Sequence, residues 1–192
     1  MRIRYNAPVV LTLTLLATAV LVIDSLSGGA VIPRYFVTYP GFRGPGASPA
    51  LSALRLFSYV LGHQGWMHLM SNFSFILLIG PVLEEKYHSG PLLVMMLVTA
   101  LVTGVLNAVF FRTGLMGASG IVFMLILLSS FSNIRSGEIP LTFILILVLF
   151  LAKEVIAAFG QDNISQFAHV IGGVCGSLFG FVFTRGSRRH AA

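Results

Sequence analysis

Charged side chains are scarce in this sequence. Only 9% of its 192 residues are Asp, Glu, Lys or Arg, whereas 56% are hydrophobic. A typical soluble domain has about 25% charged residues, and these almost always lie at the surface. So few charges cannot cover a globule in water. The composition therefore excludes an ordinary soluble domain and predicts a protein whose surface lies mostly in lipid.

Acidic residues are rarer than basic ones. Six Asp and Glu stand against twelve Lys and Arg, which gives a net charge of +6. In a soluble protein this excess could indicate a nucleic-acid partner. Here several basic residues lie near the chain ends, among them Arg2, Arg4, Arg185, Arg188 and Arg189. Basic residues beside membrane segments bind anionic headgroups, so we expect contact with membrane lipid and no nucleic-acid partner.

Several catalytic and metal-binding patterns are absent. The sequence has no H-E-x-x-H motif, the zinc-binding signature of metalloproteases. Its only aspartates, Asp24 and Asp162, lie near the ends of apolar segments, which does not support an intramembrane aspartyl pair. The single cysteine, Cys175, can form no disulfide within the chain and is interpreted as a small packing residue. We expect neither a metal nor another cofactor.

Six apolar segments are long enough to cross a membrane, since a helix needs about 20 residues to span about 30 Å of hydrocarbon. They lie at about residues 8–26, 63–83, 91–111, 115–134, 140–158 and 166–184. Lipid offers no hydrogen-bond partners to the backbone, so each segment must be helical. The sequence predicts an all-α integral membrane protein, with one six-helix domain over residues 1–192.

The first apolar segment has a second interpretation as a signal peptide, because Arg2 and Arg4 precede it. Its apolar run from Val9 to Ile23 is at the long end for a signal peptide, whose apolar region is usually about 7–15 residues. We therefore interpret it as a span. An even number of spans places both termini on one side, and a small excess of basic residues favours the cytoplasmic side.

Polar residues stand near the beginning of the second, fourth and sixth segments. Because alternate segments start from the same side of the membrane, His68, Ser119 and His169 should lie at a similar depth. His68 and Asn72 are four residues apart, so both project from one helical face. Polar and ionisable side chains inside a membrane are costly. These residues are therefore candidates for function.

Glycines accompany two of these candidates: Gly117 and Gly120 flank Ser119, and Gly172 and Gly176 follow His169. Small residues allow two helix backbones to approach closely. We therefore expect the fourth and sixth segments to pack together and to bring Ser119 within hydrogen-bond reach of His169.

Ser119 and His169 have the chemistry of a nucleophile and its base. A serine hydroxyl is a poor nucleophile until a neighbouring base takes its proton. No acidic residue adjoins His169, so a dyad is expected rather than a triad. The Ser119 backbone N–H, His68 and Asn72 could donate hydrogen bonds to a developing oxyanion. Phe123, one turn after Ser119, could hold the imidazole by stacking.

The motifs together resemble those of the rhomboid family of intramembrane proteases. The matching residues are His63, His68 and Asn72 spaced as H-x4-H-x3-N, Gly117 with Ser119 and Gly120, Gly80 with Glu84, and Ala168-His169 followed by Gly172 and Gly176. The resemblance implies a six-helix bundle with Ser119 and His169 as the dyad, and with His68 and Asn72 in the oxyanion hole. It also implies cleavage of transmembrane proteins near the membrane boundary, without a cofactor.

The resemblance also concerns two loops. Residues 27–62 would pack into the outer leaflet, and residues 159–165 would form a lid. The family often has Trp-Arg where this chain has Leu54-Arg55, so the packing of the first loop should differ. We expect no further domain before the first span, so the chain looks like a minimal catalytic core, located in a prokaryotic plasma membrane.

Two other functions stay open from the sequence alone. A membrane serine usually bonds to its own backbone, and a lone membrane histidine more often belongs to a polar network or ion path. A non-catalytic rhomboid-like protein would bind membrane clients, although such relatives typically lack the serine or the histidine. A small transporter would need polar residues in the inner halves of the spans, which are nearly all apolar. No feature indicates a particular substrate or an oligomeric state.

Overall fold

The computed structural model of the chain describes residues 4–133, 141, 144–145, 148, 152 and 163–189. Long helices make up most of this part: α1 (Pro8–Leu26), α4 (Trp66–Tyr87), α5 (Ser89–Phe110), α6 (Ser119–Asn133) and α8 (Asn163–Arg189). The described residues include no β-strand, and their only strand-like pairing is an isolated bridge between Thr38 and Leu115. The prediction of an all-helical protein is confirmed.

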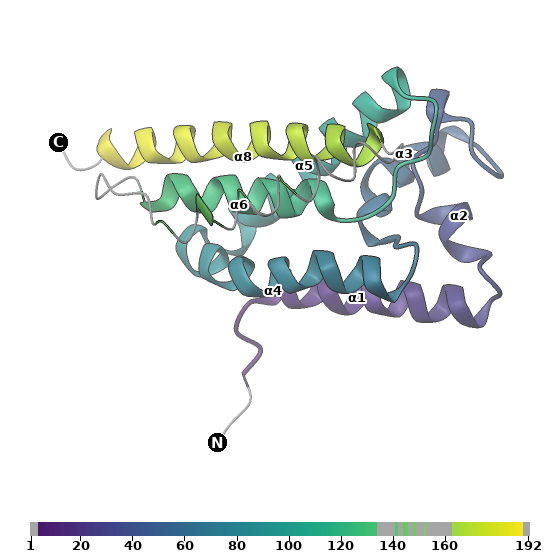
Figure 1. Cartoon of the computed structure of the whole chain (residues 1–192), viewed down its shortest axis with the longest axis horizontal. Helices are drawn as coiled ribbons and strands as arrows, with labels where there is room; N and C mark the ends of the chain where they lie inside the picture. Colours follow the sequence, from purple (N-terminus) through teal and green to yellow (C-terminus); the bar gives the residue numbers. More distant parts are fainter. Residues whose placement is uncertain are drawn as a thin grey trace.

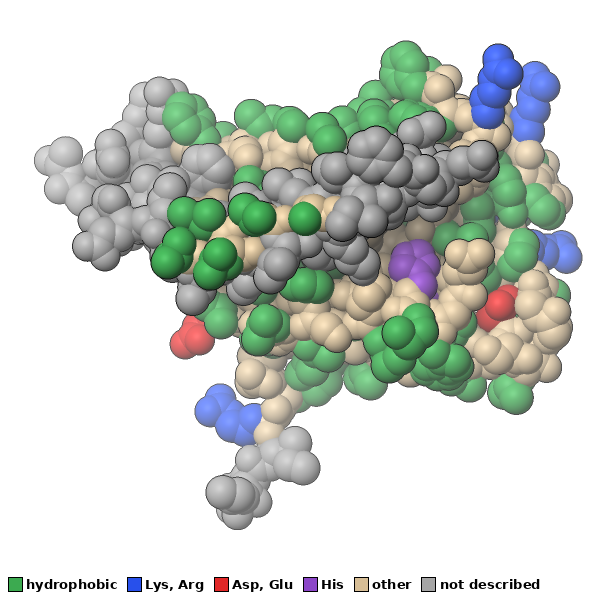
Figure 2. Space-filling view, viewed as in Figure 1, with side chains coloured by type: hydrophobic (Ala, Val, Ile, Leu, Met, Phe, Trp, Pro, Cys, Tyr) green, Lys and Arg blue, Asp and Glu red, His purple; other side chains and the backbone are tan. Residues whose placement is uncertain are grey.

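Among the described residues, three helices have the length and apolar composition to cross a membrane, namely α1, α4 and α5. α6 and α8 carry shorter apolar stretches, Ser119–Ser130 and Phe167–Val182. Large hydrophobic side chains such as Leu78 and Val170 are exposed on the outside of the bundle, and Figure 2 shows such side chains over much of one face. An exposed apolar surface of this extent fits a lipid environment. The span expected at residues 140–158 lies largely outside the described residues.

Four of the five long helices lie in two pairs (Figure 1). α8 lies alongside α6, and this is the most extensive contact between any two described elements, while α1 lies alongside α4. α6 is the central helix of the described bundle, because consecutive residues from Ile121 to Ile126 are all buried. A helix buried on every face needs apolar side chains all round, and the sequence of α6 supplies them.

α4 begins at Trp66 rather than at His63, where the sequence analysis placed the start of the second span. Just before it, Gly62 has extended backbone (ψ 132°). A Cβ on Gly62 would overlap the carbonyl oxygen of Phe36, so the chain passes directly against this part of the preceding loop. His63 therefore lies in the short non-helical connection before α4.

The segment between α1 and α4 is folded and contains α2 (Val31–Tyr35), η1 (Pro40–Phe42), α3 (Pro49–Ser58) and η2 (Tyr59–Leu61). Arg55 is 2% exposed and holds the segment together. Its guanidinium donates hydrogen bonds to the carbonyl oxygens of Arg34 and Pro45 and lies over the Tyr39 ring. Leu54, the other residue of the Leu54-Arg55 pair, is half exposed (52%). The buried packing of this loop therefore depends on Arg55 rather than on Leu54.

Glu84 joins three helix ends at the opposite end of α4. Its carboxylate accepts hydrogen bonds from the backbone N–H groups of Val9 (2.9 Å) and Val10 (3.0 Å), and from the Ser89 hydroxyl (2.7 Å). The first N–H groups of a helix have no partner within the helix, and an acidic side chain there also favours the helix dipole. Glu84 therefore caps α1 from α4 and ties both helices to the start of α5.

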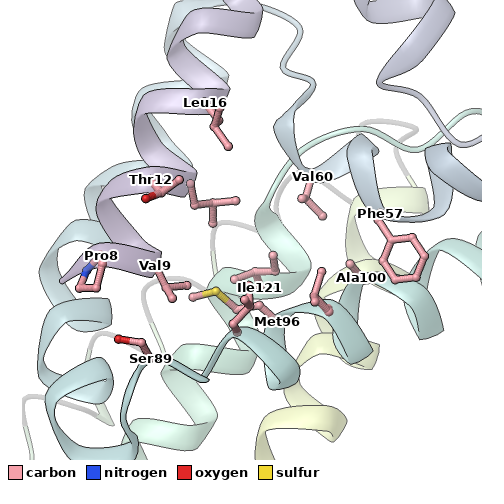
Figure 3. Close-up of a pocket in the computed structure, with 13 residues that line it drawn as sticks. Pro8, Val9, Thr12, Leu16, Phe57, Val60, Ser89, Met96, Ala100 and Ile121 are labelled. Carbon is pink, nitrogen blue, oxygen red and sulfur yellow. The ribbon is translucent and has the colours of Figure 1, made fainter. Parts of the chain in front are cut away.

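An apolar cavity of about 340 Å³ lies between α1, α5 and the segment before α4 (Figure 3). Its lining includes the buried side chains of Val60, Met96 and Ile121 and contains no charged residue. The cavity therefore marks a place where α1 and α5 do not fill the space between them. Its lining has no side chain suited to acid–base chemistry.

Candidate active site

Ser119 is the first residue of α6, and a glycine turn leads into it. Gly117 has φ +110°, a conformation that residues with a Cβ rarely adopt. A Cβ there would also lie only 2.8 Å from the Nε2 and Cε1 atoms of His68, and 3.5 Å from Nδ2 of Asn72. The backbone just before Ser119 therefore packs directly on the two polar side chains of α4.

The backbones of α6 and α8 are in contact next to Ser119. A Cβ on Gly172 would overlap the carbonyl oxygen of Gly120, and a Cβ on Gly176 would overlap that of Met124. Only glycine permits an approach this close. The first turn of α6 is thus held against the turn of α8 that follows His169.

His169 is 5% exposed and stacks on Phe123. The two ring centroids are 4.4 Å apart, and the ring planes differ by 16°. Since Phe123 lies one turn after Ser119 on α6, the imidazole is held over the first turns of that helix. Ser119 is half-buried, so the serine is more accessible than the histidine.

His68 and Asn72 lie one turn apart on α4, on the other side of the glycine turn. The backbone N–H of Gln64 donates to Nδ1 of His68 (3.4 Å), so in the neutral imidazole the proton is on Nε2, which is the nitrogen facing Gly117. Asn72 is 5% exposed. Both side chains therefore direct hydrogen-bond donors toward the turn that leads into Ser119.

One buried polar residue received no role in the sequence analysis. His63 is 1% exposed, and its Nε2 lies 3.1 Å from Nδ2 of Asn72. Its place in the H-x4-H-x3-N spacing was the available signal, but spacing alone did not reveal which side chain it contacts. The connection before α4 is not helical, so helical periodicity could not place His63 beside Asn72.

Other expected features fall partly outside the described residues. The expected lid at 159–165 is described only from Asn163, where α8 begins. In the described part of the chain, no group of three or more His, Cys, Asp or Glu residues is arranged to hold a metal ion. The polar groups that the described residues bring to this site are a hydroxyl, imidazoles and amide donors.

Comparison with known proteins gives the family. The rhomboid domain model matches residues 50–186. Rhomboid protease GlpG of Klebsiella pneumoniae is 28% identical over 98% of this chain and 68% of its own length. Rhomboid-related protein 1 of Caenorhabditis elegans is 32% identical over 78% of this chain and 43% of its own length. Rhomboid protease GlpG of Haemophilus influenzae is 23% identical over 77% of each protein. The family match includes α4, α6 and most of α8, and it covers every candidate residue. The chain belongs to the rhomboid family.

Proposed function

We propose that this protein is an intramembrane serine endopeptidase that hydrolyses peptide bonds in or near the transmembrane segments of other membrane proteins. The observation that supports it most strongly is the glycine contact between α6 and α8. This contact brings the helix turn that begins with Ser119 against the helix turn beside His169. The chain belongs to the rhomboid family, and the relatives to which it is similar include bacterial proteins named as proteases. This membership supports the same class of reaction.

In the proposed reaction, His169 takes the proton of the Ser119 hydroxyl as Oγ attacks the carbonyl carbon of the substrate. The tetrahedral intermediate collapses when the imidazolium gives that proton to the leaving amine, and an acyl-enzyme remains. His169 then deprotonates a water molecule, which attacks the ester and releases the carboxyl product and the free serine. Phe123 limits rotation of the imidazole through both steps.

The oxyanion would be stabilised from two directions. α6 begins at Ser119, and the first N–H groups of a helix have no partner within it and carry the positive end of its dipole. His68 and Asn72 supply side-chain donors from α4, against the Gly117 turn. Loss of one such donor typically lowers kcat about 100- to 1,000-fold.

The proposed setting is a membrane with both chain termini in the cytoplasm, and the bacterial relatives favour a prokaryotic plasma membrane. The exposed apolar faces of the bundle would contact lipid, and substrates would reach Ser119 from the lipid phase as single transmembrane helices. A peptide bond within a helix is protected by its hydrogen bonds. We therefore expect cleavage where small or helix-breaking residues loosen the substrate helix.

The first test is cleavage of a single-span model substrate by the purified protein in liposomes, compared with Ser119→Ala and His169→Ala. Both variants should lower kcat by about 10,000-fold or more. Ser130→Ala is the matched control, because Ser130 is a buried serine of the same helix whose hydroxyl donates a hydrogen bond to the Leu127 carbonyl oxygen. It should retain activity.

Two results would contradict the proposal. Cleavage that persists in Ser119→Ala would assign the nucleophile to another group. A folded wild-type protein that binds single-span proteins but cleaves none of several substrates would instead be a client-binding protein.

A further inference from the structure

We propose that His63 is a positioning residue, which fixes the Asn72 side-chain amide so that its NH2 group, and not its carbonyl oxygen, faces the active site. The inference rests on the proposed function and adds a residue to it. His63 lies in the connection between η2 and α4.

The first step of the argument concerns the protons of the His63 ring. Nδ1 lies 3.2 Å from the carbonyl oxygen of Leu61, and a carbonyl oxygen can only accept a hydrogen bond, so Nδ1 carries a proton. Burial of the ring, which is 1% exposed, disfavours the charged form. A neutral imidazole carries one N–H, so Nε2 is an acceptor.

The second step concerns the Asn72 amide. Its nitrogen Nδ2 lies 3.1 Å from Nε2 of His63, and an acceptor at Nε2 requires the NH2 group on that side. A rotated amide would place its carbonyl oxygen against the Nε2 lone pair, and two acceptors repel each other. His63 thereby selects one of the two amide orientations.

The third step connects this orientation to catalysis. The same nitrogen, Nδ2, is 3.5 Å from the position that a Cβ on Gly117 would occupy, so the NH2 group also borders the turn before Ser119. An amide NH2 has two hydrogens. One is bonded to His63, and the other is left for an oxyanion at Ser119.

The His63 ring is itself held in place. It meets the His68 ring edge to face with centroids 4.9 Å apart, and it contacts Phe73 with centroids 5.6 Å apart. Both proposed side-chain oxyanion donors, His68 and Asn72, are therefore in contact with one buried residue. A simple space-filling role would use the ring contacts but not the acceptor at Nε2, and this difference can be tested.

The test is a double-mutant cycle on kcat, in liposomes, with a cleavable single-span substrate. His63→Phe keeps a ring of similar size but removes the acceptor, and should lower kcat about 10- to 100-fold, because the oxyanion donor is no longer held in one orientation. KM should stay within about twofold of wild type, because ground-state binding does not use this donor. In the Asn72→Ala background, His63→Phe should cause almost no further loss, since the group on which it acts is already gone.

His63→Gln provides a second cycle and covers the case in which His63→Phe does not fold. Gln can present an amide oxygen to Asn72, so it should restore most of the activity lost in His63→Phe, and its remaining loss should again disappear with Asn72→Ala. Losses that multiply with that of Asn72→Ala in both cycles would overturn the inference and leave His63 a packing residue. A wild-type protein without Ser119-dependent cleavage would instead contradict the proposed function, so the two failures are distinguishable.

Discussion

Gly117 shows how much a single residue can determine at this site. Its φ of +110° and the 2.8 Å approach to the His68 ring are separate constraints, and each excludes a side chain. The backbone conformation turns the chain into α6, and the close contact keeps the proposed oxyanion donors beside that turn. We therefore expect stability and the proposed catalysis to depend on the same missing Cβ.

The variant Gly117→Ala should lose both stability and activity. A residue with a Cβ at this φ costs about 1–3 kcal/mol, and the methyl group would push the His68 ring away from the turn. We expect a lower unfolding temperature and a drop in kcat of about 100-fold or more, measured by thermal unfolding in detergent and by substrate cleavage.

Gly90→Ala is the control for this substitution. Gly90 lies in the first turn of α5, and a Cβ there would meet no atom within 4 Å. The unfolding free energy of Gly90→Ala should stay within about 0.5 kcal/mol of wild type.

A different outcome would contradict the prediction for Gly117. If Gly117→Ala has the kcat of wild type, the donors on α4 are not needed for cleavage.

At the scale of elements, the contact between α6 and α8 holds the first turn of α6, which begins at Ser119, against the turn of α8 that follows His169. Helix pairs in membranes associate through packing rather than through a hydrophobic driving force, so small residues at the contact have a large effect. Gly172 and Gly173 are neighbours on α8 with different surroundings. A Cβ on Gly172 would overlap the Gly120 backbone, whereas a Cβ on Gly173 would make ordinary contact with Leu127 at 3.7 Å.

This pair gives a matched prediction. Gly172→Ala should separate the two helices, destabilise the protein by about 1–3 kcal/mol, and strongly reduce cleavage. Gly173→Ala should change neither measurement by much. Equal behaviour of the two variants, measured in the same detergent and with the same substrate, would contradict a tight contact at Gly172.

The ends of α1, α4 and α5 depend on Glu84. Glu84→Ala leaves the N–H groups of Val9 and Val10 without their acceptor, which should cost about 1–3 kcal/mol for the unsatisfied groups. Glu84 lies about 18 Å along α4 from Asn72, at 1.5 Å per residue. We therefore expect a lower unfolding temperature but near-normal kcat at temperatures where the variant stays folded.

Glu85→Ala removes the same charge from the adjacent, exposed position. It should leave the unfolding temperature unchanged, because surface substitutions usually have effects within about 0.5 kcal/mol. If both variants unfold at the same temperature as wild type, the helix-capping role of Glu84 is wrong.

At the scale of the whole molecule, the proposed orientation predicts which segments reach each side of the membrane. In cells, Ala47→Cys, in the exposed part of the loop between α1 and α4, should react with a membrane-impermeant maleimide. Gly90→Cys, at the exposed junction of α4 and α5, should react only after permeabilisation. Cys175 is buried and should give little background, which the parent protein measures. The reverse pattern of labelling would invert the orientation.

The class of the whole molecule was predictable from the sequence, because the surrounding lipid determines which residues and which secondary structure the chain can have. A chain with 9% charged residues must face lipid, and lipid requires helices. The all-helical membrane class follows from these two facts. Periodicity and the rise per residue also assign His68, Ser119 and His169 to similar depths, since depth depends only on position along a helix.

Only the tertiary structure decided which side chains meet. Depth says nothing about the rotation of a helix or about its neighbours, and these follow from packing. The contact of His63 with Asn72 depends on a non-helical connection, which Gly62 permits by passing against Phe36. The capping of α1 by Glu84 joins residues far apart in sequence. The sequence by itself determined that the chain lies in lipid, that it is helical, and which residues are chemical candidates. Close packing determined which side chains contact one another, because those surfaces meet only after folding.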